Sequence, residues 1–190
     1  MVAGDGSGGK KWRVIGRREL LATPVFTVTE RENEGPDGKR GRFTVLEAPE
    51  WATVVPLVEG PEGPAFLMVR QYRHGSDEVS VESPGGVVER GEEPLKAAAR
   101  ELFEETGCRA GRIELAGTVS PNPAIMSNHF HVFLATELST AGGQSLDEHE
   151  ILDAFLVPVS EVEVRMGEKP YDHALMSAAL FLAERLLSRR

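Results

Sequence analysis

The sequence contains only one cysteine, Cys108, so no disulfide can form within the chain. Its first residues, MVAGDGSGGKKW, are rich in glycine and lack the apolar segment that a secretory signal requires. Proteins kept in a reducing compartment rarely form disulfides. These absences favour a cytoplasmic protein with a flexible tail at residues 1–11.

A long hydrophobic run and an excess of positive charge are also absent. No stretch of about 18 consecutive apolar residues occurs, which argues against a membrane-spanning helix. The chain has 21 Lys and Arg against 30 Asp and Glu, for a net charge of −9. Such a chain repels nucleic acid unless its basic residues cluster, and they are scattered except for Arg185, Arg189 and Arg190. We therefore expect neither a membrane nor a nucleic acid as a partner.

The composition predicts one globular domain with a full core, since 41% of the 190 residues are hydrophobic. Residues 12–47 show partial alternation of apolar and polar side chains around the turn-forming stretch 35–38, which predicts a β-rich lobe. Short apolar strands are expected at residues 52–58 and 65–70. No internal repeat is visible in the sequence.

The rest of the chain mixes helices and strands. The sequence predicts a loop over residues 80–94, a helix over 94–106 and a final helix over 171–187. Strands are expected at residues 112–120, 129–138 and 151–159. Ser160 and Glu163 have the spacing of a capping box and predict a short helix. This mixture is typical of an α/β sandwich.

The helix over residues 94–106 has well-marked ends, with Pro94 in its first turn and Gly107 after its last. Apolar side chains at helical spacing form a stripe that can pack on a sheet. The stripe consists of Leu95, Ala98, Ala99 and Leu102.

Three acidic side chains of this helix, Glu101, Glu104 and Glu105, are expected to converge on one face. Like charges at this spacing cost about 0.2–0.5 kcal/mol per pair. Anions near a helix C-terminus cost about 0.3–1 kcal/mol more. One explanation is a solvated acidic face balanced by Lys96 and Arg100. The other is a site for Mg²⁺ or Mn²⁺, whose preferred ligands are carboxylate oxygens.

The surrounding spacing resembles a known signature. Gly86 is followed after five residues by Glu92 and after seven more by residues 100–108, RELFEETGC. This pattern is similar to the Nudix hydrolase motif, G-x5-E-x7-R-E-U-x-E-E-x-G-U, where U is a bulky apolar residue. Cys108 is a small substitute at the last position. A chance match at every other fixed position is very rare.

The resemblance implies the Nudix α/β/α sandwich with a mixed sheet as the catalytic domain, over residues 48–190. A small β-rich lobe over residues 12–47 would precede it. The implied metal ligands are Glu101, Glu104, Glu105 and the backbone carbonyl of Gly85.

The resemblance also implies the roles of the remaining motif residues. Glu92 and Arg100 would orient the helix, and Gly86 would allow close approach of the backbone. In the family, water attacks a diphosphate that joins a nucleoside to another group, with Mg²⁺ or Mn²⁺ balancing the phosphate charge. The implied catalytic residues include Glu104 and Glu105.

Further segments resemble the ADP-ribose pyrophosphatase branch of the family. These are VRQYR at residues 69–73, VESPGG at residues 81–86, and Pro123, which lies sixteen residues after Gly107. By this resemblance Arg73 would contact the phosphates or ribose, and Glu82 would lie near the metal or substrate. The N-terminal lobe would pair two subunits into a homodimer.

In this branch the catalytic base comes from a loop after the motif. The acidic loop at residues 147–150 fits that place and makes Glu150 the first candidate and Glu148 the second. A solvated turn is the alternative interpretation, because acidic residues are common in loops.

The substrate is open at this point. ADP-ribose is favoured by the resemblance. In that branch a Gly-rich loop often follows the proline that corresponds to Pro123, and residues 121–128 depart from this pattern. GDP-mannose or another nucleotide sugar is therefore an alternative substrate. A nucleoside triphosphate hydrolase and a non-catalytic nucleotide-sugar sensor are others. His129 and His131 share one face of a strand and are more typical of packed or hydrogen-bonded histidines than of metal ligands. Trp12 and Trp51 could stack on adenine but are more typical of core or interface packing.

Overall fold

The computed structural model describes residues 11–146 and 151–189. The chain forms two compact units. The first consists of Met1–Pro49 with Asn122–Asn128, and the second of Glu50–Pro121 with His129–Arg190. Among the described residues, none of the helices combines the length and apolar character needed to cross a lipid bilayer.

The first unit contains a three-stranded antiparallel sheet in the order β1-β2-β3. Its strands are β1 (Arg13–Ala22), β2 (Thr27–Glu34) and β3 (Arg40–Glu47). Gly38, with a φ of 78°, lies in the turn between β2 and β3, a conformation that suits glycine. The alternation in residues 12–47 thus predicted strands correctly.

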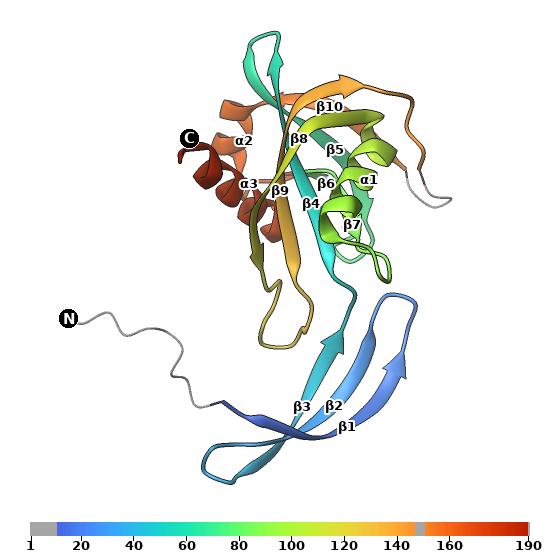
Figure 1. The fold of residues 1–190 in the computed structure, drawn as a ribbon, viewed down its shortest axis with the longest axis vertical. Coiled ribbons are helices and arrows are strands. Elements are labelled where there is room, and N and C mark those ends of the chain that lie inside the picture. Colours follow the sequence, from blue (N-terminus) through green and yellow to red (C-terminus); the bar gives the residue numbers. More distant parts are fainter. Residues whose placement is uncertain (1–10, 147–150, 190) are drawn as a thin grey trace, which may run out of the picture. The chain divides into compact units, whose positions relative to one another are not determined.

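The second unit is built on a seven-stranded mixed sheet in the order β10-β5-β4-β9-β8, with β6 paired to β5 and β7 to β4 (Figure 1). β4 and β9 run parallel, whereas β4 and β5 run antiparallel. The strands are β4 (Trp51–Gly60), β5 (Gly63–Arg73), β6 (Glu78–Glu82), β7 (Gly85–Val87), β8 (Cys108–Val119), β9 (Phe130–Thr140) and β10 (Leu152–Pro158).

Alternating side chains of the central strands divide the core into two layers. Val54 of β4 packs in the cluster that includes Ala98 and Leu102 of α1 (Pro94–Thr106). Its neighbour Val55 packs in the cluster that includes Leu180 of α3 (Ala174–Leu187). Because successive side chains of a strand point to opposite faces, the sheet is covered on both sides. Figure 1 shows α1 on one face and α2 (Val159–Arg165) with α3 on the other. The predicted α/β sandwich with a mixed sheet is confirmed.

The α1 helix has the predicted bounds, but its buried face differs from the predicted stripe. Leu95 is 44% exposed, and the face that packs on the sheet includes Glu101 and Glu105 together with Ala98 and Leu102. The prediction that Leu95 belongs to the apolar stripe was therefore wrong. The helix is turned so that two of its acidic residues, and not Leu95, are buried.

Three other predictions of local structure were wrong. Residues 80–94 were expected to form a loop, but part of this stretch pairs with the sheet as β6 and β7. Ser160 does not cap α2, which begins after Pro158 without a side-chain cap hydrogen bond. The final helix begins at Ala174 and not at Tyr171.

Candidate functional site

Arg100 of α1 joins three acidic side chains of the motif. Its guanidinium donates two 3.0 Å hydrogen bonds to Glu92, one of 2.8 Å to Glu101 and one of 2.9 Å to Glu104. It also donates to the carbonyl of Val87 at 3.1 Å, which ties the helix to β7. The bonds to Glu92 contribute most to raising the pKa of Arg100 above its ordinary value, and they lower the pKa of Glu92. This network connects Glu92 of the motif loop and Val87 of β7 to the helix.

The third acidic side chain of the helix, Glu105, lies deeper. It is 2% exposed, and its Oε2 accepts a 3.0 Å hydrogen bond from the backbone amide of Gly85. The neighbouring Gly86 is in close contact with Glu101, since a Cβ on Gly86 would lie 2.4 Å from Glu101 Oε1. The two glycines of β7 therefore allow a strand to lie directly on the carboxylates of α1.

The local charge of this group is strongly negative. Three carboxylates (Glu92, Glu101 and Glu104) contact the single Arg100 guanidinium, which leaves two negative charges in excess if all three are ionised, and Glu105 of the same helix adds a further carboxylate. Glu101 is only 8% exposed. Buried carboxylates are costly unless they are paired, so the group favours a further cation.

The donor set of this group fits a hard divalent cation. It consists of carboxylate oxygens, which are ligands that Mg²⁺ and Mn²⁺ prefer. Within residues 11–146 and 151–189, no three His, Cys, Asp or Glu side chains are arranged as a metal-binding group. The Arg100 guanidinium lies between Glu101 and Glu104 and contacts both.

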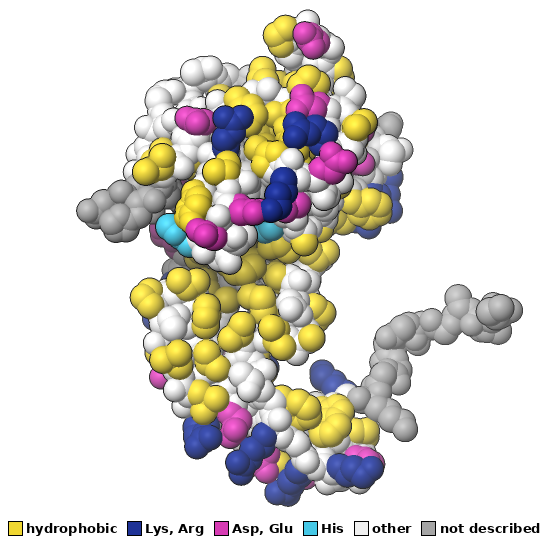
Figure 2. All heavy atoms as spheres, turned by 180° about the vertical axis from the view of Figure 1, so that it is seen from behind, with side chains coloured by type: hydrophobic (Ala, Val, Ile, Leu, Met, Phe, Trp, Pro, Cys, Tyr) yellow, Lys and Arg dark blue, Asp and Glu magenta, His cyan; other side chains and the backbone are white. Residues whose placement is uncertain are grey.

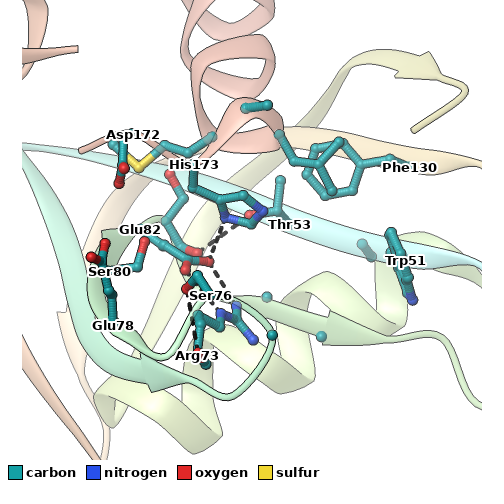
Figure 3. A pocket seen from close by; sticks show the side chains of 18 of the residues that line it. Trp51, Thr53, Arg73, Ser76, Glu78, Ser80, Glu82, Phe130, Asp172 and His173 are labelled. Carbon is teal, nitrogen blue, oxygen red and sulfur yellow. Dashed lines mark hydrogen bonds and ion pairs between the residues drawn. The ribbon is translucent and has the colours of Figure 1, made fainter. Parts of the chain in front are cut away.

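A cavity of about 550 Å³ borders strand β7 of the motif, and Figure 3 shows the side chains that line it. Gly85 and Gly86 line its wall, so the same strand faces the acidic group and the cavity. Side chains from four further strands and from the segment before α3 complete it. They include Trp51 and Thr53 of β4, Arg73 of β5, Ser80 and Glu82 of β6, Phe130 of β9, and His173 before α3.

Glu82 lies at the centre of the charged part of the cavity. Arg73 donates two hydrogen bonds to its carboxylate, from Nε at 2.9 Å and from Nη2 at 2.7 Å. Nδ1 of His173 lies 2.9 Å from Glu82 Oε2, so the two side chains form an ion pair when the imidazole is protonated. Burial alone acts to raise the pKa of Glu82, but the interactions with Arg73 and His173 outweigh it and lower this pKa to about 2. Glu82 is therefore ionised at neutral pH.

The structure brings most of the predicted site residues together. Arg73, Glu82, Gly85 and Gly86 line the cavity. The motif residues that bear charge form the group beside it. Glu148 and Glu150 lie outside the described residues. Trp51 lines the cavity and also packs against the hydrophobic core, as the core-packing interpretation of this residue predicts.

Three other predicted candidates are not among the residues that line the cavity. Trp12 belongs to the first unit, where it packs edge-to-face on Phe43 with ring centroids 5.6 Å apart. His129 Nδ1 and His131 Nε2 lie 3.3 and 3.2 Å from Glu50 Oε2, which supports the interpretation of these histidines as hydrogen-bonded residues.

The sequence interpretation missed His173. It was taken as part of the final helix, whereas it precedes that helix and faces Glu82. Its partner is distant in the sequence, so no local pattern could have identified the contact.

Comparison with known proteins gives consistent matches. A family model described as NUDIX domain matches residues 49–178. The ADP-ribose pyrophosphatase of Bacillus subtilis (strain 168) is 31% identical over 150 residues, covering 78% of this chain and 80% of the relative. The methanol dehydrogenase activator of Bacillus methanolicus is 27% identical over 172 residues, covering 90% and 91%. A crystal structure of an ADP compounds hydrolase superposes with a TM-score of 0.81 over 95% of this chain and 96% of that chain, at 23% identity.

Proposed function

Because the chain belongs to the Nudix hydrolase family, a class of enzymes that hydrolyse nucleotide diphosphate compounds, we propose that its substrate is a nucleoside diphosphate sugar. The preferred substrate in this proposal is ADP-ribose, cleaved to AMP and ribose 5-phosphate with a divalent cation. One observation carries the proposal: Arg73, Glu82 and the glycine strand of the motif line the same cavity. The similarity to a pyrophosphatase named for ADP-ribose adds support.

In this proposal the cation is Mg²⁺ or Mn²⁺, held by Glu101, Glu104, Glu105 and the carbonyl of Gly85. When bound, such an ion balances phosphate charge and lowers the pKa of a bound water. The chain contributes the positions of the ligands. Arg100 fixes two of the carboxylates, and the Gly85 amide fixes that of Glu105. The excess of negative charge in this group supports the assignment.

Arg73 and Glu82 bind the substrate in this proposal. The two hydrogen bonds between them hold the guanidinium in one orientation at the cavity wall, where its charge can contact a phosphate. Because Glu82 stays ionised, Arg73 keeps its partner across the neutral pH range. Binding the phosphates in a fixed orientation places the diphosphate for attack by water.

The general base in this proposal is Glu150, with Glu148 as the second candidate; both lie outside the described residues. A base must come within hydrogen-bond reach of the attacking water, directly or through one further water. The separate substitutions Glu150→Gln and Glu148→Gln distinguish the two, because the base variant loses turnover and keeps its substrate affinity.

We also propose that the chain forms a homodimer through its N-terminal lobe. Six large apolar side chains of this lobe, residues 12–47, are 40–63% exposed: Trp12, Val14, Leu20, Leu21, Val25 and Phe43. Figure 2 shows hydrophobic side chains gathered over part of the surface. Exposed apolar groups on so small a sheet are typical of a protein–protein contact, and a second copy of the chain fits the expectation from the resemblance.

The test of the proposed function is a hydrolysis screen with identified products. ADP-ribose, GDP-mannose, dinucleoside polyphosphates and nucleoside triphosphates are each incubated with Mg²⁺ or Mn²⁺, and in parallel with EDTA. We expect AMP and ribose 5-phosphate from ADP-ribose at the highest kcat/KM, and no turnover with EDTA. Faster release of pyrophosphate from a nucleoside triphosphate would contradict the proposed substrate class. Full turnover in EDTA would contradict the proposed dependence on a metal ion. If the protein binds one of these compounds but hydrolyses none of them, the alternative of a non-catalytic nucleotide-sugar sensor is favoured.

A further inference from the structure

Strand β6 carries polar side chains at every second position. Glu78, Ser80 and Glu82 alternate with Val79 and Val81, and Val81 belongs to the hydrophobic core. Because side chains of a strand alternate between its two faces, the three polar groups share the face opposite Val81. All three line the cavity (Figure 3). Glu82 is held by Arg73, so Ser80 and Glu78 are the further polar groups that this strand offers to a ligand.

Ser80 is buried but lacks a hydrogen-bond partner. It is 7% exposed, and its Oγ has no partner among the residues that the structure describes. Buried hydroxyl groups in proteins are nearly always hydrogen-bonded, because losing water without a replacement is costly. A hydroxyl can donate one hydrogen bond and accept others. Ser80 can therefore form hydrogen bonds with the hydroxyl groups of a bound ligand.

Two acidic side chains, Glu78 and Asp172, line the cavity together with Ser80. The segment before α3 runs along β6, since the Val81 amide donates to the Pro170 carbonyl at 2.9 Å and Lys169 pairs with Glu78. Asp172 of this segment lines the same cavity and is exposed to it. In Figure 3, Glu78, Ser80 and Asp172 lie toward one end, and Trp51 and Phe130 toward the other.

The hydroxyl of Ser80 and the carboxylates of Glu78 and Asp172 together favour hydroxyl groups of a ligand over phosphate groups. Ionised carboxylates only accept hydrogen bonds, so Asp172 and Glu78 favour a ligand that donates them. A phosphate would be repelled by both carboxylates, and Lys169 offsets only one of these charges. A neutral group with several hydroxyls matches both the carboxylates and Ser80.

We propose that Ser80 and Asp172 form a subsite for the hydroxyl groups of the terminal sugar of the substrate. They are specificity-determining residues, which select a nucleoside diphosphate sugar over a nucleotide ending in phosphate. The inference rests on the proposed function, because it assigns one end of the same cavity. The diphosphate of the substrate keeps its proposed place near Arg73 and the motif.

The test compares two substrates that differ only at this end. ADP-ribose carries the sugar, and the β-methyl ester of ADP keeps the diphosphate but lacks it. For Ser80→Ala we expect kcat/KM to fall ~10-fold with ADP-ribose, equivalent to about 1.4 kcal/mol, and to stay unchanged with the methyl ester. Asp172→Asn should give the same pattern. Ser139→Ala, an exposed serine of β9, is the matched control and should change neither value.

Direct binding separates failure of this inference from failure of the proposed function. Calorimetry with Ca²⁺ in place of Mg²⁺ measures the affinity for ADP-ribose and for the methyl ester without relying on turnover. If the native protein hydrolyses neither compound, the proposed function is contradicted, and binding still decides the subsite. A loss of affinity confined to ADP-ribose in Ser80→Ala supports it. Equal losses for both ligands, or no loss in a variant with unchanged Tm, overturn it.

Discussion

The backbone amide of Gly85 donates a hydrogen bond to Glu105 Oε2 across 3.0 Å. Glu105 lies in the last turn of α1, where the helix dipole disfavours an anion. The amide compensates for part of that cost, and it fixes one oxygen of a carboxylate that is almost fully buried. The contact therefore sets the distance between the acidic group and the strand that borders the cavity.

Replacing Glu105 with glutamine tests the acidic group. The side chain keeps its length, and its amide oxygen can still accept the bond from Gly85, so the fold should persist. We expect kcat to fall at least ~10²-fold, because the variant loses the negative charge that holds the cation. Steady-state kinetics with ADP-ribose measure the effect. Glu59→Gln, at an exposed position of β4, is the control, and near-native turnover of the Glu105 variant would remove this residue from the metal site.

Gly86→Ala tests whether the close contact with Glu101 matters. The new Cβ would lie 2.4 Å from Glu101 Oε1, so the carboxylate must move. We expect kcat/KM to fall ~10-fold or more and the Mg²⁺ concentration for half-maximal activity to rise, because a displaced ligand weakens the site. Gly143→Ala is the matched control, since its Cβ would meet no atom within 4 Å. Equal behaviour of the two variants would show that Glu101 adjusts without loss.

Local signals in the sequence predicted the central helix well. Pro94 and Gly107 fix its two ends, and Gly107 adopts the left-handed conformation with a φ of 69°. The spacing also identified the charged group, because residues three and four apart on a helix are neighbours. The orientation of the helix was not predictable in the same way. It depends on packing with β4 and β7, which are distant in sequence, and this packing exposes Leu95 and buries Glu101.

The cavity was only partly predictable for the same reason. Arg73 and Glu82 were found by resemblance, but His173 and Ser80 were not. Their positions depend on the segment before α3 lying along β6, a contact between distant parts of the chain. The glycines at 85 and 86 favoured a loop in the sequence, whereas they permit β7 to pair with β4: a Cβ on Gly85 would lie 2.5 Å from the Ala52 carbonyl.

Arg73→Lys tests the fixed orientation of the guanidinium. Lysine keeps the positive charge but cannot form the paired hydrogen bonds that Arg73 makes with Glu82. We expect kcat/KM for ADP-ribose to fall about 10- to 100-fold, the range for losing hydrogen bonds to charged groups. Arg70→Lys is the control on the same strand, because Arg70 stacks on Phe155 and does not line the cavity. If kcat/KM falls equally in both variants, the loss reflects a disturbance of strand β5 and not the loss of a substrate contact.

The low pKa of Glu82 predicts a pH dependence of stability. The folded pKa is about 2, below the ordinary value of 4.5, so ionised Glu82 stabilises the folded state. This contribution is complete above pH 4.5 and is lost as the pH falls toward 2; a shift of this size corresponds to on the order of 3 kcal/mol. The free energy of unfolding of the native protein, relative to Glu82→Gln, should therefore decrease below pH 4.5. Urea unfolding at several pH values measures it, and a constant difference between the two proteins would contradict the ion pairing.

The proposed homodimer predicts a mass in solution of about twice the 20.7 kDa of one chain. Light scattering after gel filtration measures this mass. Leu21 and Val25 of the first unit are 57% and 63% exposed, and burying them against a second copy would remove apolar surface from water. The double substitution Leu21→Arg and Val25→Arg should therefore shift the mass toward that of one chain, because a buried unpaired charge opposes association. Phe181→Arg, at an equally exposed apolar position of α3, is the control and should leave the dimer intact. If the native chain is a monomer, or if Phe181→Arg alone dissociates it, the N-terminal lobe is not the dimer contact.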